Sequence, residues 1–397
     1  MATDSRSAEP ASAPAAEAIG SAGFVHLVAR ADGDALAASG LLARALADRG
    51  TPFQVSVGPT VADRTERVRD RQAAADDVTV AIGAVDADAT RLDADDRPAT
   101  LAALEAVRGL EASPDHVLAL AGLVAAGVEP GAGESEWVLE TARSQGLVDR
   151  RPGVAVPTTD PVDGLAHSTR LRAPWSGDLS ATRTALEELG VDLTAPEEFD
   201  ADARRTIGSA VALDIVGDDE AVPAAAETVQ RVLRPYATPD APFATVGGYA
   251  DVLEATARTK PGTGAALAMG HDAREPALDA WREHGRRAHA ALEAGSTGRY
   301  DGLFVVGIDD GPVEAVAGIA AAYRSPEATV LAVGDGEAAI ATRGGEPLGA
   351  TVEAVARELE EVGIEGVAYD GGRRRGYLRY DPAVDESTLI QIVRDRR

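Results

Sequence analysis

The chain contains no cysteine, which excludes disulfide bonds, thiol catalysis and cysteine-based zinc sites. Lysine is also scarce, because Lys260 is the only one and arginine supplies every other long basic side chain. Aromatic residues make up 4% of the sequence, and no apolar run approaches the roughly 20 residues that a membrane-crossing helix needs. Carboxylates, histidines and arginines therefore remain as the groups that could carry chemistry, and no membrane partner is expected.

The formal net charge of −27, the abundance of alanine and the scarcity of lysine are typical of proteins that work in concentrated salt. At about 1 M salt the Debye length falls to about 3 Å, so distant carboxylates would hardly repel a polyanion. High salt also weakens phosphate contacts, because it reduces the gain from counterion release. The net charge therefore neither excludes nor favours a nucleic-acid partner, and any such site must be local and built from arginine.

The first 21 residues are rich in Ala, Ser, Pro and Glu and lack the basic start and apolar middle of a signal peptide. This composition predicts a disordered acidic tail over residues 1–21 and a cytoplasmic protein. The remaining length is ample for two domains.

Strands alternate with helices from Gly23 onward, which is the pattern of a parallel α/β sheet. A more helical stretch follows, and a second α/β pattern begins near Gly298. The expected strands lie at 24–29, 53–57, 78–82, 303–308, 329–333, 338–342, 367–369 and 376–380. In the first sheet, the ligand site should lie at the carboxyl ends of the strands.

Two aspartates, Asp32 and Asp34, follow the first expected strand directly. In extended backbone their side chains would point the same way, and such a pair can bind a divalent metal ion. The alternative is structural: Gly33 supplies a turn, and Asp34 is the N-cap of a helix over 35–48. Both interpretations stay open on these residues alone.

Five stretches in order carry a family resemblance: the turn at 28–38, the segments 174–178 and 186–193 together, the stretch 243–270, the strand end 341–343 and the loop 371–376. They resemble the archaeal RecJ-like branch of the DHH phosphoesterase superfamily, the group that also contains the RecJ-related subunit of the eukaryotic replicative helicase. The resemblance implies an α/β fold with a parallel-sheet DHH-type domain over 22–199. A helical connecting region over 200–297 and a smaller α/β DHH-associated domain over 298–397 would follow.

In active members of this superfamily, the first turn is a His-x-Asp-x-Asp-Gly motif that binds manganese, and later acids and an Asp-His-His triplet complete a two-metal site. Here Asp32 and Asp34 remain, but Arg30 takes the place of the histidine, and residues 82–85 and 120–127 lack the later acids. No Asp-His-His occurs. The resemblance therefore predicts a vestigial or weak metal site at the two aspartates, no catalytic residue and no required cofactor. Manganese or magnesium would be needed only by an active protein.

The loop at 371–376 takes the place of a Gly-Gly-Gly-His loop that grips nucleic-acid phosphate in RecJ-type nucleases. Glycines let backbone amides approach a phosphate, and guanidinium groups bind its oxygens in a fork. The alternative is a basic hairpin that balances neighbouring acids. The predicted nucleic-acid-binding residues are Arg343, Gly371, Gly372, Arg373, Arg374 and Arg375.

The resemblance implies a catalytically impaired nuclease homologue that acts in DNA replication or repair as a nucleic-acid-binding or replisome scaffold subunit. Its partners would be single-stranded nucleic acid, GINS and the replicative helicase. One alternative is an active manganese-dependent, single-strand-specific exonuclease or phosphoesterase that rebuilds its metal site from acids such as Asp86, Asp88 or Asp115. Another is a metabolic or RNA-processing scaffold with no role at DNA. An active enzyme requires several carboxylate or imidazole groups to converge on Asp32 and Asp34.

Overall fold

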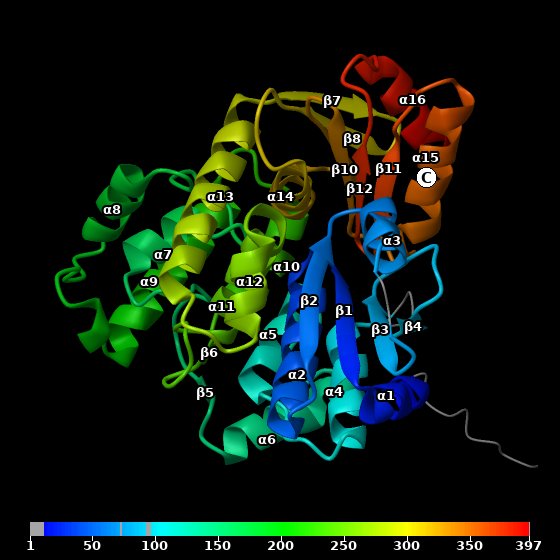
Figure 1. Cartoon of the computed structure of the whole chain (residues 1–397). Coiled ribbons are helices and arrows are strands. Elements are labelled where there is room, and N and C mark those ends of the chain that lie inside the picture. Colours follow the sequence, from blue (N-terminus) through cyan, green and yellow to red (C-terminus); the bar gives the residue numbers. More distant parts are fainter. Residues whose placement is uncertain (1–11, 72–73, 93–96, 397) are drawn as a thin grey trace, which may run out of the picture.

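The computed structural model describes residues 12–71, 74–92 and 97–396 of the chain. Figure 1 shows a first sheet, drawn in blue to cyan, below a second sheet drawn in yellow-brown to red. The first sheet has the order β2-β1-β3-β4, and all its ladders are parallel. Its strands are β1 (Phe24–Arg30), β2 (Phe53–Gly58), β3 (Asp77–Ile82) and β4 (Thr90–Arg91). The predicted α/β class with a parallel first sheet is confirmed.

Helices cover the first sheet and bury its apolar side chains. Every residue of α5 is buried, as expected for a helix that is apolar on nearly all sides. This helix packs against α2, α4 and α11 in one large core. The helices of this part are α1 (Ser12–Ser21), α2 (Gly33–Arg49), α3 (Val61–Arg69), α4 (Ala99–Gly109), α5 (His116–Ala125) and α6 (Glu136–Ser144), with a 3₁₀ turn, η1, at Gly133–Ser135.

The prediction of a disordered tail over residues 1–21 is wrong for residues 12–21, which form α1. Ala15 and Ile19 on this helix are buried, and α1 packs against α4. The small alanines that made the segment look like low-complexity chain let the helix approach α4 closely. Residues 1–11 lie outside the described part of the chain.

The middle of the chain is mainly helical, with one small antiparallel sheet formed by β5 (Asp149–Arg150) and β6 (Tyr236–Ala237). Helices α11 and α12 pack on α2 and belong to the first core, whereas α9 and α10 belong to a second core that includes residues of the C-terminal sheet. Each of these two cores contains residues from both sides of the predicted division at 199/200. The division stays a prediction. The helices are α7 (Pro161–His167), α8 (Leu179–Glu187), η2 (Pro196–Glu198), α9 (Ala201–Gly217), α10 (Pro223–Val232), α11 (Val246–Thr259), α12 (Pro261–Ala268) and α13 (Arg274–Ala294).

The second sheet has the order β11-β12-β10-β9-β8-β7, in which the β8–β9 pair is parallel and the other ladders are antiparallel. The predicted boundary near Gly298 falls inside its first strand. The strands are β7 (Ser296–Tyr300), β8 (Leu303–Gly307), β9 (Thr329–Val333), β10 (Glu337–Thr342), β11 (Ala368–Gly371) and β12 (Arg375–Arg379). The helical elements are α14 (Val313–Ile319), the π-helical turn η3 (Ala320–Arg324), α15 (Gly349–Glu361) and α16 (Glu386–Arg396).

The two sheets meet where α3, which follows β2, packs against β11. The carboxyl ends of β1, β2 and β3 therefore face the β11–β12 hairpin (Figure 1). Within the described residues, no helix is both long and apolar enough to cross a membrane.

Candidate functional site

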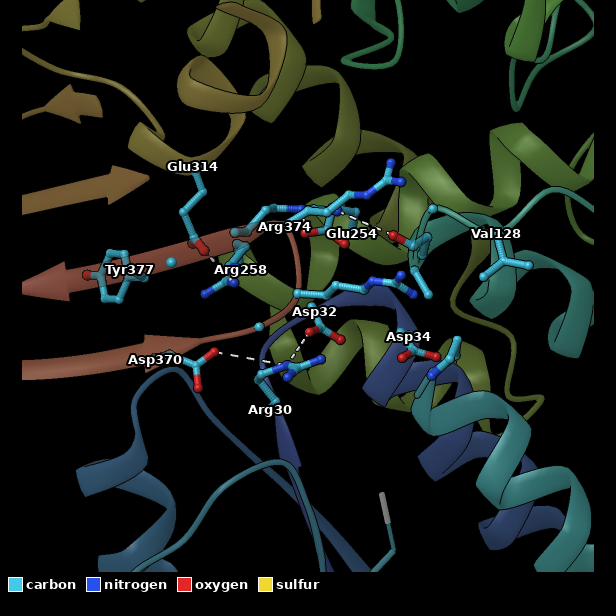
Figure 2. A pocket seen from close by; sticks show the side chains of 18 of the residues that line it. Arg30, Asp32, Asp34, Val128, Glu254, Arg258, Glu314, Asp370, Arg374 and Tyr377 are labelled. Atoms are coloured by element: carbon cyan, nitrogen blue, oxygen red, sulfur yellow. Dashed lines mark hydrogen bonds and ion pairs between the residues drawn. The ribbon is translucent and has the colours of Figure 1, made fainter. Parts of the chain in front are cut away.

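A cleft of about 150 Å³ lies between the carboxyl edge of the first sheet and the β11–β12 hairpin. Figure 2 shows the side chains that line it, which come from both halves of the chain. The lining is strongly charged, with arginines and acids in nearly equal number. The arginines are Arg30, Arg97, Arg258, Arg373, Arg374 and Arg375, and the acids are Asp32, Asp34, Glu254, Glu314 and Asp370.

Asp32 is the N-cap of α2, and this corrects the expectation that Asp34 would be the cap. Asp32 has extended backbone, and its side chain accepts a hydrogen bond of 2.8 Å from the amide of Ala35. It also forms an ion pair with Arg30. Burial acts to raise the pKa of Asp32, but the charge of Arg30 and the Ala35 amide outweigh it and lower the pKa. Asp32 is therefore an ionised carboxylate that the protein itself already neutralises.

Asp34 lies in the first turn of α2 rather than in extended backbone, so the two aspartates do not form the same-facing pair that the sequence suggested. Its buried carboxylate accepts hydrogen bonds from the amides of Ala99 at 2.8 Å and Thr100 at 2.9 Å, and from the Thr100 hydroxyl at 2.6 Å. The N-cap residue of α4, Pro98, forms no side-chain cap. Asp34 therefore caps α4 from another helix, and burial together with the charge of Asp32 raises its pKa.

The residues present do not fit the pair of manganese ions that the RecJ-like resemblance implies for an active protein. The carboxylates of Asp32 and Asp34 are engaged by backbone amides, a hydroxyl and a guanidinium, and Arg30 places a positive charge beside them. Over the described ranges, no group of three or more His, Asp or Glu side chains is arranged to hold a metal ion. The candidate replacement ligands Asp86, Asp88 and Asp115 do not line the cleft, and Asp115 caps α5.

Ion pairs across the cleft join the β11–β12 hairpin to helices that pack around the first sheet. Arg64 of α3 binds Asp370 of β11 at 2.5 Å. Arg375 of β12 pairs with Glu254 of α11, whose carboxylate also accepts a hydrogen bond from the amide of Gly33. The charge of Glu254 raises the pKa of Arg375. These two pairs fasten both strands of the hairpin to helices α3 and α11, which pack around the first sheet.

A third pair joins Arg258 of α11 to Glu314 of α14 at 2.5 Å (Figure 2). Burial raises the pKa of Glu314 to about 7, although the charge of Arg258 acts to lower it. The cleft therefore contains a carboxylate whose pKa lies near neutrality, next to a permanent guanidinium charge.

The predicted loop 371–376 is the turn of the β11–β12 hairpin, and the structure places Gly372, Arg373, Arg374 and Arg375 in the cleft lining. Arg375 points inward to Glu254, whereas Arg373 and Arg374 are exposed. Neither of these two forms an ion pair within the described part of the chain. Partial burial and repulsion from Arg231 and Arg373 lower the pKa of Arg374. The tip of the hairpin thus presents two guanidinium groups available for an anion.

Gly371 serves packing rather than the cleft: a Cβ added there would lie 2.7 Å from the Cα of Gly349. Arg343 lies in an adjoining groove of about 640 Å³ that shares Arg374 and Arg375 with the cleft. Its guanidinium donates to the backbone carbonyl oxygens of Ala321 and Ser325. The structure therefore brings the predicted binding residues close to one another, but it gives Gly371 and Arg343 partners inside the protein.

Sequence reasoning missed three residues that form ion pairs across the cleft, namely Arg64, Glu254 and Glu314, and considered Asp370 only as one of the acids that a basic hairpin would balance. Arg64 lies in a segment that showed only a run of charges, and its partner Asp370 is 306 positions away along the chain. Asp370 directly precedes the glycine-rich loop, which was the one available signal for it.

Comparison with known proteins shows that the chain is similar to a haloarchaeal protein over its whole length. The uncharacterized protein rrnAC1427 of Haloarcula marismortui is 46% identical over 402 residues, and the match covers 100% of both chains. A family described as the C-terminal domain of uncharacterized protein rrnAC1427 matches residues 295–395, which contain the second sheet.

Among solved structures, CDC45 from Entamoeba histolytica is similar with a TM-score of 0.58 and 7% identity, over 94% of this chain and 95% of that one. A structure of exonuclease RecJ bound to manganese aligns with a TM-score of 0.45 and 14% identity, over 97% of this chain and 93% of that one. The likeness to CDC45 confirms the predicted RecJ-like DHH fold, and identity this low shows the fold alone. On the full-length identity to its haloarchaeal relative, the chain belongs to the rrnAC1427 protein family.

Proposed function

We propose that this chain is a catalytically impaired RecJ-like DHH protein that binds single-stranded nucleic acid in DNA replication or repair. The observation that carries the proposal is the pair Arg373 and Arg374 in a chain of net charge −27. Both are exposed at the mouth of the cleft, and neither has a carboxylate partner among the residues that the structure describes. Guanidinium groups bind phosphate oxygens in a fork, and such contacts supply most of the affinity of non-specific nucleic-acid binding. This local pair of cations contrasts with the chain's net charge of −27.

The loss of catalysis is supported by the use that the protein makes of Asp32 and Asp34. Two-metal phosphoryl transfer needs carboxylates that bridge the ions and a water that the ions activate. Here one aspartate caps α2 and pairs with Arg30, and the other caps α4. Each carboxylate thus has a structural role that explains its presence without a metal ion.

The test combines a binding assay with a nuclease assay in high salt. We expect a labelled oligothymidylate to bind and to remain intact in the presence of Mn²⁺. Cleavage of single-stranded DNA or RNA that Asp32→Ala abolishes would instead establish the alternative, an active manganese-dependent exonuclease or phosphoesterase. Absence of binding at every salt concentration at which the chain is folded would contradict the nucleic-acid role.

The partners GINS and the replicative helicase are proposed by analogy within the RecJ-like branch, and fold alone does not determine a partner. Affinity purification of the tagged full-length chain from haloarchaeal cells, at the salt concentration of the cytoplasm, tests them. Co-purification of replication subunits would support a replisome scaffold. Co-purification of metabolic or RNA-processing proteins alone would contradict it.

A further inference from the structure

Arg64 is a fully buried arginine at the carboxyl edge of the first sheet. Its Nε donates to the carbonyl oxygen of Ala84, just beyond β3, at 3.0 Å. Its Nη1 donates to the carbonyl oxygen of Gly58, the last residue of β2, also at 3.0 Å. Since β2 and β3 flank β1 in the sheet, this guanidinium spans the end of the central strand. Arg64 is therefore a permanent cation built into the edge where a parallel sheet binds its ligand.

The backbone around Arg64 is adapted to its side chain. Gly83 has a φ of +114°, which L side chains rarely adopt, and a Cβ added there would lie 3.1 Å from the Cβ of Arg30 and 3.5 Å from the Nε of Arg64. A Cβ at Gly58 would lie 2.7 Å from the Cγ of Arg64. Glycine at these two strand ends therefore leaves space that the side chains of Arg30 and Arg64 occupy.

The third contact of Arg64 crosses to the other half of the chain. Its Nη2 donates to Asp370, which is 5% exposed and lies on the strand that enters the hairpin. Arg30 approaches the other carboxylate oxygen of Asp370 at 4.0 Å. The opposite strand of the hairpin is fastened by Arg375 to Glu254. Both strands of the hairpin are therefore tied down, and only the tip, with Arg373 and Arg374, projects into the cleft mouth.

We propose that Arg64 is a positioning residue for anion binding: by holding Asp370 against the sheet edge, it places Arg373 and Arg374 to bind nucleic-acid phosphates without a bridging divalent cation. This inference rests on the proposed nucleic-acid function. It adds that the positive charge of the site comes entirely from guanidinium groups, because the cleft carboxylates are engaged by arginines, amides and hydroxyls of the chain itself.

The first experiment measures the affinity of the full-length chain for a fluorescein-labelled oligothymidylate by anisotropy, in EDTA and in Mn²⁺. The KCl concentration is the lowest at which circular dichroism shows the chain to be folded. We expect the two dissociation constants to agree within about twofold, which is a small difference on the scale of a single contact. Binding that requires Mn²⁺ would overturn the inference and leave the proposed function standing. Absence of binding in both conditions would overturn the proposed function as well.

The second experiment tests Arg64 through Asp370→Asn, which keeps the shape of the side chain, and through Arg64→Lys, which keeps one charge but loses the fork. We expect each to weaken binding about tenfold, because a displaced hairpin misplaces both tip arginines. The slope of log K against log[KCl] should fall by less than it does when an arginine is removed, since both tip guanidinium groups are still present. Arg373→Gln, by contrast, should lower that slope by about 1.

Two controls separate positioning from simple loss of stability. Arg69→Lys changes an exposed arginine on the same helix, α3, and should bind as the wild type does. Leu389→Ala opens a cavity in the core beneath α16 and should lower the melting temperature without changing the affinity. Wild-type affinity in both Asp370→Asn and Arg64→Lys would overturn the inference. An affinity that falls with melting temperature in Leu389→Ala as it does in those variants would also overturn it.

Discussion

Parallel strands end side by side in two places within the described part of the chain, and these two places differ in charge. At the edge of β1, β2 and β3, arginines match or outnumber the acids, and ion pairs close the cleft against the second sheet. At the edge of β8 and β9, a groove of about 840 Å³ is lined by Asp309, Asp310 and Asp335, all of them exposed. The fold provides a ligand edge in both places. The groove at β8 and β9 also contains Arg286 and Arg287, but they pair with Glu283 and Asp310. In the first cleft, by contrast, Arg373 and Arg374 form no ion pair with any described residue.

The comparison shows that topology alone does not identify the site. Both edges belong to strand–helix–strand units of the same chain, and the acidic edge offers the larger groove. A carboxylate-rich surface is what a chain of net charge −27 shows by default, so acids at an edge carry little information. The informative feature is an arginine that pairs with an acid far away in the sequence, as Arg64 does with Asp370. Such a pair requires complementary residues in two distant segments.

The largest expected effect concerns Asp34. Asp34→Ala leaves the amides of Ala99 and Thr100 buried without an acceptor and removes one of the two acceptors of the Thr100 hydroxyl, so we expect the free energy of unfolding to fall by about 3 kcal/mol. Asp34→Asn retains one acceptor oxygen and should cost about 1 kcal/mol. Chemical denaturation in high salt measures both. Unchanged stability in Asp34→Ala, together with a lost response to Mn²⁺, would show a metal ligand instead of a helix cap.

The next effect concerns the tip of the hairpin. The double variant Arg373→Gln/Arg374→Gln should weaken oligothymidylate binding about a hundredfold and lower the salt slope by about 2, because each arginine contributes one phosphate contact. Anisotropy titrations over a range of KCl concentrations measure both quantities. Arg286→Gln/Arg299→Gln removes the same charge from exposed positions outside the cleft lining and is the matched control. Equal losses in the two double variants would mean that net charge, not the hairpin, determines binding.

Much of the fold could be predicted from the sequence, because the periodicity of β1, α2 and the β8–α14–β9 unit is local. For the cleft, the sequence indicates only the residues in its loops and not the partners that these residues contact. Asp32 and Asp34 were recognised as a pair, but either could cap a helix in that motif, and the sequence does not show which amides each one reaches. Arg64 could not be identified, since its importance comes from two strand ends and from Asp370, far along the chain.

Glu314 gives the first edge a pH dependence that the acidic edge should lack. Its pKa in the folded state is about 7, above the ordinary value near 4.5, so the folded chain binds more protons than the unfolded chain between these pH values. Its contribution to stability is therefore full below about pH 4.5 and is lost as the pH rises through 7, by at most about 1.4 kcal/mol per pH unit. The free energy of unfolding of the wild type should therefore fall relative to that of Glu314→Gln as the pH rises over this range, as measured by denaturation at several pH values.

The same protonation should strengthen binding at low pH, because neutral Glu314 leaves the charge of Arg258 without compensation. Oligothymidylate affinity should rise between pH 8 and pH 6 in the wild type but not in Glu314→Gln. Asp335→Asn, at the exposed acidic edge, is the control and should keep the wild-type pH profile. A flat profile in the wild type would show that Glu314 is outside the electrostatic reach of the bound phosphate.

The smallest effect is expected at the acidic edge itself. Asp309→Asn and Asp335→Asn alter exposed side chains, so each should change the free energy of unfolding by less than about 0.5 kcal/mol. Each should also leave oligothymidylate affinity unchanged in high salt, where charges farther apart than a few ångströms are screened. If either variant strengthens binding in high salt, the bound strand extends to this second edge. The preference for the arginine-lined cleft would then depend on repulsion from the acidic edge as well as on attraction within the cleft.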